Sequence, residues 1–378
     1  MKKEHKVIPY GHQSIDDSDI NAVSKVLTSD WLTQGPDVSR FEEELAVASG
    51  AKYAVAVSSG TAALHLAYLA IGLKKGDEVI TTPNTFVATT NMLLAVGAKP
   101  VFCDIRLDTY NLDEDQITNH LTSKTRAIVP VHFAGTPCNM RKVMAIAKKH
   151  NIFVVEDACH ALGASYGGRA IGSIGDITVF SFHPVKSITT GEGGALVTNS
   201  KKFAERAKAL RSHGVIKNLQ GFNVMTDFGF NYRLTDISCA LGISQLKRMD
   251  TFLAKRRKVV AWYREILSKN PHIIIPSEEP DSSSAWHLYV IRVKDPADRL
   301  PLYDYLRGEG IGVNFHYPPV YSHPFYRKAG YSKTKLKNGS IYADTAITLP
   351  IFPELKKTDV ARVAESINQY FKVGTSLG

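Results

Sequence analysis

The chain has 378 residues, of which 44% are hydrophobic and 22% charged, a composition that suits a globular protein with one large and one smaller domain. No window is long and apolar enough to span a membrane, and the basic start at residues 1–6 is not followed by the apolar stretch of a secretory signal, so we expect a cytoplasmic protein. The formal net charge of +10 would fit nucleic acid, an anionic substrate or solubility alone.

Short β-prone runs alternate with helical segments between residues 53 and 199. This alternation predicts an α/β domain with a largely parallel or mixed sheet flanked by helices. Helices are expected to begin near Thr61, Thr85, Asp113 and Pro137. Ligands of such sheets bind at the loops beyond the strand ends. The expected strands are 53–57, 78–82, 99–103, 127–131, 153–156, 177–182 and 195–198.

After residue 199 the pattern is helical through residue 267, and the segment 271–284, rich in Pro, Ser, Asp and Glu, then reads as a loop. The remaining residues predict a small α/β domain, so we expect a large domain at 1–250 and a small one at 251–378. Its expected elements are a strand at 286–293, a helix at 300–309, a strand at 312–316 and a helix at 357–371.

The densest basic run, residues 255–258, lies in a helical pattern without interleaved aromatic residues. Such a run more often forms a solvated helix face, so nucleic-acid binding is disfavoured. The four cysteines have none of the close spacings of zinc or redox motifs, and we expect reduced, mostly buried thiols: Cys103, Cys138, Cys159 and Cys239.

A candidate anion site lies at residues 57–64, where a β run passes through small hydroxylated residues directly into a helix. The free N–H groups and dipole of such a helix start attract phosphate. Ser59 and Thr61 would add hydroxyl donors, and Gly60 would permit close approach. A Ser or Thr here is more often only a helix cap, so both interpretations stay open at this point.

Residues 154–160 form an apolar run that ends in acids and is followed closely by a histidine. A carboxylate at a strand end can keep a heteroaromatic ring nitrogen protonated, and Asp157 is the candidate for that role. Asp157 could instead cap the next turn. His160 could lie against a cofactor or be a buried, satisfied histidine.

The most informative segment is 180–194, in which Lys186 lies between an apolar strand and a Gly-Glu-Gly-Gly turn. A lone lysine is normally a surface charge, but desolvation in this setting would lower its pKa and leave the amine free to react with a carbonyl group. The segment resembles the cofactor-lysine segment of the DegT/DnrJ/EryC1/StrS family of sugar aminotransferases. The resemblance extends over nearly the whole chain, through 32–36, 82–86, 211–214 and 230–234.

This resemblance implies the type I fold of pyridoxal-phosphate-dependent aminotransferases, an α/β fold with a mixed, mostly parallel seven-stranded sheet and a smaller C-terminal α/β domain. It also implies a homodimer with shared active sites. Lys186 would hold pyridoxal 5′-phosphate, with pyridoxamine phosphate as the alternate form, and would move protons in both halves of the reaction. Asp157 would pair with the pyridine nitrogen, and Phe86 would stack on the ring. The other implied cofactor contacts are Ser59, Gly60, Thr61, His160, Ser181 and the partner's Asn231.

Within the family, the chain most resembles the UDP-4-amino-4,6-dideoxy-N-acetyl-beta-L-altrosamine transaminases of pseudaminic acid synthesis, on residues 32–35, 187–194, 211–214 and 315–317. This implies transfer of an amino group from L-glutamate to C4 of a UDP-linked 4-keto-6-deoxy-N-acetylhexosamine, with no metal, nucleic-acid or membrane partner. A proline-rich, aromatic loop is about as often a packing element as a substrate wall. The implied nucleotide-sugar contacts are Tyr10, Asp30, Trp31, Leu32, Thr33, His316, Tyr317, Pro318 and Pro319.

Several alternatives remain at this level. The motifs around the cofactor do not separate this sugar from those leading to 4-amino-arabinose, bacillosamine, legionaminic acid or perosamine. A dehydratase of the same fold would carry His in place of Lys186. A non-catalytic relative or nucleic-acid-binding regulator would have no reason to keep Asp157, Ser181 and Lys186 together. An oxidoreductase is disfavoured because no strand opens into the spaced-glycine dinucleotide turn.

Overall fold

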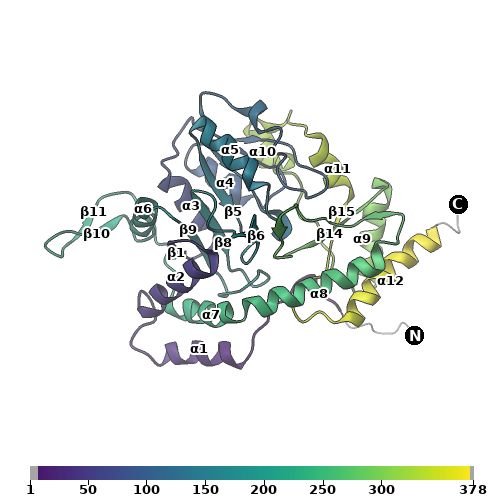
Figure 1. Cartoon of the computed structure of the whole chain (residues 1–378), viewed down its shortest axis with the longest axis horizontal. Helices are drawn as coiled ribbons and strands as arrows, with labels where there is room; N and C mark the ends of the chain where they lie inside the picture. Colours follow the sequence, from purple (N-terminus) through teal and green to yellow (C-terminus); the bar gives the residue numbers. More distant parts are fainter. Residues whose placement is uncertain (1–6, 375–378) are drawn as a thin grey trace.

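The computed structural model describes residues 7–374, so the basic start at 1–6 lies outside the described residues. A seven-stranded sheet in the order β1-β9-β8-β5-β4-β2-β3 forms the centre (Figure 1). Only β9 runs antiparallel to its neighbours, which confirms the predicted mixed, mostly parallel sheet. The strands are β1 (Tyr53–Val57), β2 (Glu78–Thr81), β3 (Lys99–Phe102), β4 (Thr125–Val129), β5 (Phe153–Asp157), β8 (Ile177–Ser181) and β9 (Gly194–Thr198).

Helices cover both faces of this sheet, which is why its strands read as nearly continuous apolar runs. Alternate residues of one strand belong to different cores. Val154 packs in the core that includes α2, α5 and α7, whereas Val155 packs in the core that includes α3, α4 and α6. These helices are α2 (Pro36–Ser49), α3 (Gly60–Ala70), α4 (Ala88–Ala95), α5 (Met140–His150), α6 (Lys201–Arg211) and α7 (Asp236–Lys247).

The sheet direction brings several strand ends to one edge. β5 and β8 are parallel, and β1 points the same way because both β1 and β8 are antiparallel to β9. The residues that follow β1, β5 and β8 therefore gather at this edge. Gly194 lets the start of α3 lie close to β9, since a Cβ at this position would lie 2.5 Å from the backbone carbon of Ser59.

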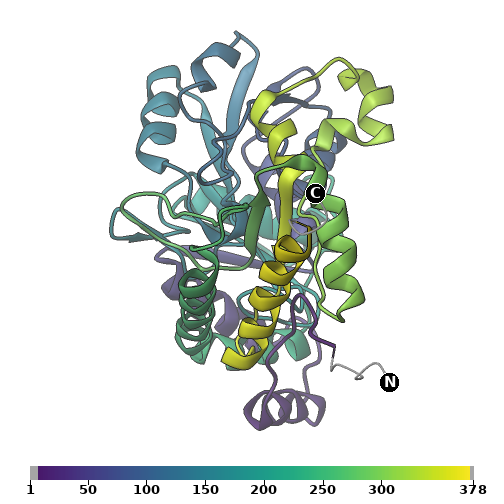
Figure 2. The ribbon, with the colours of Figure 1, turned by 90° about the vertical axis from the view of Figure 1, so that its right-hand side faces the viewer.

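The C-terminal part has its own core around an antiparallel three-stranded sheet of β12 (Ile273–Ile274), β14 (Tyr289–Val293) and β15 (Ala346–Leu349). Ile8 joins this core and bridges to Ile311, so the start of the described chain packs against its C-terminal part. No helix within residues 7–374 is long and apolar enough to cross a membrane. Figure 2 shows the helices around this sheet: α8 (Met249–Leu267), α9 (Arg299–Gly308) and α12 (Lys357–Gly374). The domain division at residue 250 stays a prediction.

Two elements predicted from the sequence are absent, and a third is interrupted. The helix expected near Asp113 is replaced by turns and a short 3-10 helix at Ile117–His120, because the Asp113 carboxylate accepts hydrogen bonds from Asp115 N and Gln116 Nε2. The strand expected at 312–316 makes only an isolated bridge, between Asn314 and Thr348.

The helical stretch expected after residue 199 is interrupted by a hairpin, β10 (Val215–Lys217) and β11 (Asn223–Met225), which projects from the body of the molecule (Figure 1). Gly214 and Gly221, before and within it, have positive φ values of 69° and 83°, which stop a helix from continuing. Helices α1 (Asp17–Leu27), α2 and α11 (Lys337–Thr345) were not anticipated from the sequence.

The expectation of a solvated face for residues 255–258 is also wrong at one position. Lys255, Arg257 and Lys258 are exposed, but only 1% of Arg256 is exposed. Arg256 lies one helical turn from Phe252 and from Val260, on the apolar stripe of α8. Helical spacing, rather than local charge, would have identified this buried position.

Candidate active site

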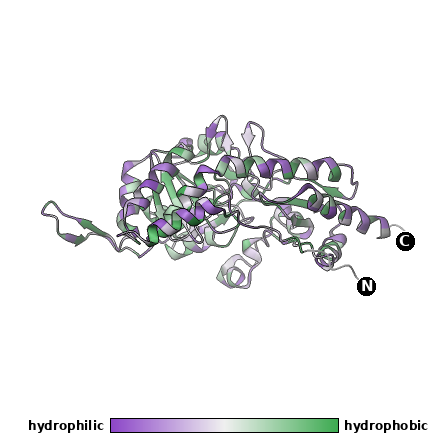
Figure 3. Ribbon diagram, turned by 90° about the horizontal axis from the view of Figure 1, so that it is seen from below, coloured by the Kyte–Doolittle hydropathy of each residue, from purple (hydrophilic) through white to green (hydrophobic). Residues whose placement is uncertain are grey.

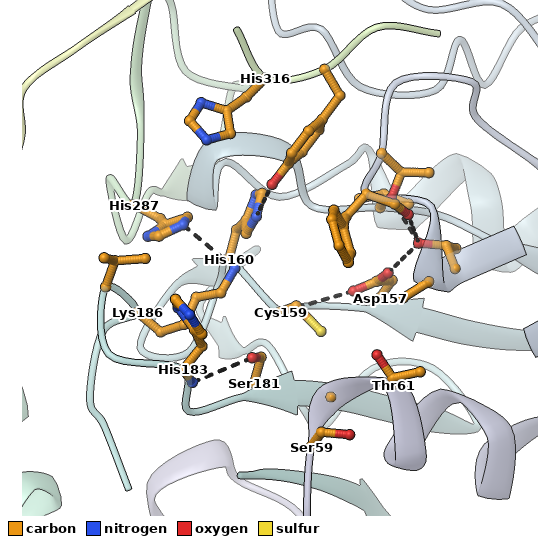
Figure 4. A pocket seen from close by; sticks show the side chains of 18 of the residues that line it. Ser59, Thr61, Asp157, Cys159, His160, Ser181, His183, Lys186, His287 and His316 are labelled. Carbon is orange, nitrogen blue, oxygen red and sulfur yellow. Dashed lines mark hydrogen bonds between the residues drawn. The ribbon is translucent and has the colours of Figure 1, made fainter. Parts of the chain in front are cut away.

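A cavity of ≈ 730 Å³ opens where the carboxyl ends of the sheet meet the C-terminal part (Figure 4). The seven-stranded sheet supplies residues that follow β1, β2, β5 and β8. The opposite wall comes from distant segments around Tyr10, His287 and residues 314–317. Most cofactor-contact residues expected from the sequence therefore lie in one space.

The start of α3 forms one end of this cavity. Ser59 caps the helix by accepting a hydrogen bond from Ala62 N at 3.1 Å, and Thr61 is exposed on the first turn. Gly60 lies against the end of β8, since a Cβ there would be 3.0 Å from Ser181 Cβ and 3.1 Å from Cys159 Sγ. A helix N-terminus with three nearby hydroxyl groups is a donor set that suits a phosphate. Ser59, Gly60, Thr61 and Ser181 all line the cavity.

Asp157 ends β5 and presents its carboxylate to the same space, with 5% of the residue exposed. Its Oδ2 accepts from Thr89 Oγ1 at 2.6 Å, and its Oδ1 accepts from Cys159 N at 3.2 Å. Two donors on separate oxygens fix the orientation of this carboxylate. A fixed negative charge at this place suits a protonated ring nitrogen.

Lys186 is partly buried on the cavity wall, and its Nζ lies 3.5 Å from His287 Nε2 (Figure 4). Within residues 7–374, no carboxylate lies within ion-pair distance of this amine. Burial lowers the pKa of Lys186 below its ordinary value, and this outweighs the opposite effects of Cys159 and Asp157. The amine is therefore biased toward its neutral, nucleophilic form.

Phe86 follows β2 and remains 57% exposed although it lines the cavity. Its ring centroid lies 6.0 Å from that of Tyr317. An apolar ring left uncovered inside a cavity has a face available for stacking.

Three histidines line the cavity: His160, which follows β5, and His287 and His316 on the opposite wall. Ala134 N donates to His160 Nδ1 at 3.3 Å, so His160 Nε2 carries the proton and donates to the Tyr317 hydroxyl at 3.2 Å. Burial, followed by the charge of Lys186, lowers the pKa of His160 and His287, and lowers that of His316 to about 4. All three rings are therefore neutral at neutral pH.

The residues expected to contact the sugar are divided between two places. Tyr10, His316 and Tyr317 line the cavity, whereas Pro318 and Pro319 do not. Within one chain, Asp30, Trp31, Leu32 and Thr33 also lie outside it, and Trp31 lines a separate hollow of ≈ 770 Å³ between α1, α2 and α7. Asn231 is exposed and does not line the cavity.

The sequence did not indicate two residues of this wall, His287 and Asn314. His287 precedes β14 in a segment that reads only as a strand, and Asn314 lies in a segment that was expected to be one. Both reach the cavity through the packing of the C-terminal part, which leaves no local pattern in the sequence.

Comparison with known proteins gives a consistent result. The DegT/DnrJ/EryC1/StrS aminotransferase family matches residues 13–368. A Campylobacter jejuni protein named UDP-4-amino-4,6-dideoxy-N-acetyl-beta-L-altrosamine transaminase is 40% identical over 366 residues, covering 96% of this chain and 96% of that protein.

Solved structures are similar over the same extent. Helicobacter pylori PseC, described as an aminotransferase involved in the biosynthesis of pseudoaminic acid, has a TM-score of 0.94 and 35% identity over 97% of this chain and 100% of its own. A sugar aminotransferase described as putative, Spr1654 from Streptococcus pneumoniae in its PLP-form, has a TM-score of 0.91 and 30% identity over 96% of this chain and 98% of its own.

Proposed function

This chain belongs to the DegT/DnrJ/EryC1/StrS aminotransferase family, and we propose that it uses pyridoxal phosphate to move an amino group from L-glutamate to C4 of a UDP-linked 4-keto-6-deoxy-N-acetylhexosamine. The product would be UDP-4-amino-4,6-dideoxy-N-acetyl-beta-L-altrosamine, the sugar that the name of the C. jejuni relative contains. The observation that carries the proposal is that Lys186, Asp157 and the start of α3 share one cavity. Four free cysteines accord with a cytoplasmic location, which we also propose.

The residues of the cavity fit pyridoxal phosphate. The start of α3, with Ser59, Thr61 and Ser181, would bind the phosphate, and Phe86 would stack on the ring. Asp157 would keep a proton on the ring nitrogen. When bound, the cofactor supplies an electron sink that stabilises negative charge at the reacting carbon.

Lys186 Nζ is the group placed to move protons. In its neutral form the amine would accept the proton from the α-carbon of L-glutamate and later give a proton to C4 of the sugar. The lowered pKa values of His160, His287 and His316 make these imidazoles weak bases, so Lys186 is the stronger base in the cavity. One side chain would therefore serve both halves of the reaction.

The wall of Tyr10, Asn314, His316 and Tyr317 would contact the sugar. It combines aromatic rings with an amide, a hydroxyl and imidazole groups, the mixture that orients a polar ligand in a pocket. The cavity of ≈ 730 Å³ has room for a cofactor and part of a second ligand.

A homodimer is also part of the proposal. The hairpin of β10 and β11, with its turn and the residues just after it, carries apolar side chains that residues 7–374 leave exposed, and Figure 3 shows green, hydrophobic stretches between purple ones along it. A second copy would bury them, and it would bring the partner's Asn231 toward the cavity. The exposed apolar residues are Ile216, Leu219, Phe222, Val224, Met225 and Phe228.

The test of the chemistry uses purified protein loaded with pyridoxal phosphate. Addition of L-glutamate should remove the visible absorbance of the bound cofactor, and addition of the UDP-4-keto sugar should restore it while mass spectrometry detects the amino sugar. Protein that never acquires the visible band would refute the cofactor assignment. Protein that responds to L-glutamate but aminates only another nucleotide 4-keto sugar would refute the choice of acceptor.

The shared site is tested by mixing two inactive variants, Lys186→Ala and Asn231→Ala. Hybrid dimers would contain one intact site, so activity should reappear on mixing. Absence of rescue, in a mixture that light scattering shows to be dimeric, would contradict a contribution from the partner's Asn231.

A further inference from the structure

The guanidinium of Arg256 is buried next to the cavity, and Glu354 interacts with its charge only from beyond ion-pair distance. Arg256 lies on α8, and 1% of the residue is exposed. No carboxylate lies within ion-pair distance of it in residues 7–374, and Arg256 Nε has no hydrogen-bond partner there. A charge removed from water normally has a counter-ion, so burial of this guanidinium costs free energy. A functional role would explain why the residue is placed here.

The hydrogen bonds of Arg256 show what it connects. Its Nη2 donates to the carbonyl oxygen of Val185 at 3.3 Å, directly before Lys186. Its Nη1 donates to the carbonyl oxygens of Trp286 at 3.2 Å, His287 at 3.3 Å and Ile351 at 3.2 Å. One side chain thus joins the segment of Lys186 to the segment of His287.

The same two segments meet inside the cavity. Lys186 Nζ lies 3.5 Å from His287 Nε2, and His287 Nδ1 is buried with no hydrogen-bond partner among residues 7–374. The amine and the imidazole therefore contact each other on the cavity side, while Arg256 ties their main chains together from behind. A shift of either segment would separate the two groups.

We propose that Arg256 is a positioning residue for the reaction, which holds Lys186 against His287 by binding the main chain of both segments. This role rests on the proposed function, because it assumes that Lys186 is the reacting amine. The rigid planar fork of arginine can reach carbonyl groups on both sides, which the single ammonium of a lysine cannot do.

The charge of Arg256 has a second effect, on the protonation of Lys186. A nearby cation disfavours an ammonium group, so Arg256 lowers the pKa of Lys186, although burial is the larger cause. Removal of the charge should raise that pKa. The other titratable groups that interact with Lys186 are Asp157 and Cys159, after the end of β5, and His160, His287 and His316.

The experiment measures acylation of Lys186 by acetic anhydride across a pH series, in the full-length protein without cofactor, by mass spectrometry. Exposed Lys255 serves as an internal reference. The midpoint for Lys186 should lie below that of Lys255. Arg256→Gln should raise it by about half to one pH unit, which slows acylation up to about tenfold at a fixed lower pH. Arg256→Lys should restore the wild-type midpoint, and Arg257→Gln, at the exposed neighbour, should leave it unchanged.

The positioning role is measured in the loaded enzyme. Arg256→Lys keeps the charge but loses most of the carbonyl contacts, so kcat should fall about tenfold while KM for both substrates stays within about twofold. Unchanged kcat in Arg256→Lys would overturn the proposal. Equal pH midpoints for the acylation of Lys186 in Arg256→Gln and Arg256→Lys would overturn it as well. If Arg256→Gln does not fold, the kcat of Arg256→Lys decides alone.

A further measurement distinguishes failure of this proposal from failure of the proposed function. Pyridoxal phosphate added before the reagent should protect Lys186 from acylation and leave Lys255 reactive. Absence of protection, together with the expected shift in Arg256→Gln, would refute the cofactor role of Lys186 and leave the electrostatic link between Arg256 and Lys186 intact.

Discussion

The two ends of the cavity are built in different ways. The end with Ser59, Asp157 and Ser181 consists of residues at or just after the ends of strands of one sheet. The end with Tyr10 and residues 314–317 comes from opposite parts of the chain and forms only when the C-terminal part packs against the large sheet. The sheet alone therefore fixes the proposed cofactor end, whereas the packing of the C-terminal part against the sheet fixes the proposed sugar end.

This difference separates chemistry from selectivity. Substitutions at the strand-end residues should slow the reaction with every substrate, because these residues would act on the cofactor. Substitutions on the opposite wall should change the handling of the sugar and leave the reaction with L-glutamate nearly intact. Each of the following variants tests that division.

Lys186→Ala should have the largest effect. Loss of the amine removes both the attachment of the cofactor and the proton carrier, so both half-reactions should fall by at least about 10³-fold. The visible absorbance of the bound cofactor should disappear as well. Retention of that absorbance would place the cofactor lysine elsewhere.

Asp157→Ala should retain bound cofactor and slow both half-reactions by about 10²-fold or more, since a fixed charge next to the reacting group is lost. Thr89→Val keeps the charge of Asp157 but removes the 2.6 Å hydrogen bond to it, together with the hydrogen bonds of Thr89 Oγ1 to Thr85 Oγ1 and to the Phe86 carbonyl oxygen, and its effect should be about tenfold. Equal losses in the two variants would show that Asp157 acts through its hydrogen-bond network rather than its charge. Stopped-flow measurement with L-glutamate alone separates the first half-reaction.

The division also explains what the sequence could predict. The residues of the proposed cofactor end could be predicted because each motif, such as that around Lys186, is a continuous stretch of sequence at a strand end. The direction of the strands then brings these motifs together. Arg256 was misjudged because its neighbours in sequence are charged, although its helical neighbours Phe252 and Val260 are buried. His287 could not be found, because only tertiary packing places it beside Lys186.

Tyr317→Phe should affect the sugar end alone. The hydroxyl hydrogen bond with His160, 3.2 Å long, would be lost, and kcat/KM for the sugar should fall about threefold to tenfold. The half-reaction with L-glutamate should stay within about twofold. Tyr321→Phe is the matched control, because the Tyr321 hydroxyl is buried with no hydrogen-bond partner in the part of the chain that the structure describes. Equal losses in both half-reactions of Tyr317→Phe would break the proposed division.

His316 gives the smallest and most specific prediction, on stability. Burial lowers its pKa to about 4 in the folded protein, against about 6.5 in an unfolded chain. As pH falls from 6.5 toward 4, the unfolded chain binds the proton first, so the stability that comes from neutral His316 is present above pH 6.5 and is lost over this window. Its contribution to the free energy of unfolding should decline by at most about 1.4 kcal/mol per pH unit.

Urea unfolding at several pH values should therefore show a shallower dependence of the free energy of unfolding on pH in His316→Asn than in wild type. His12→Asn, at an exposed histidine, should keep the wild-type slope, and a wild-type slope in His316→Asn would mean that this ring is not held neutral by the sugar end of the cavity.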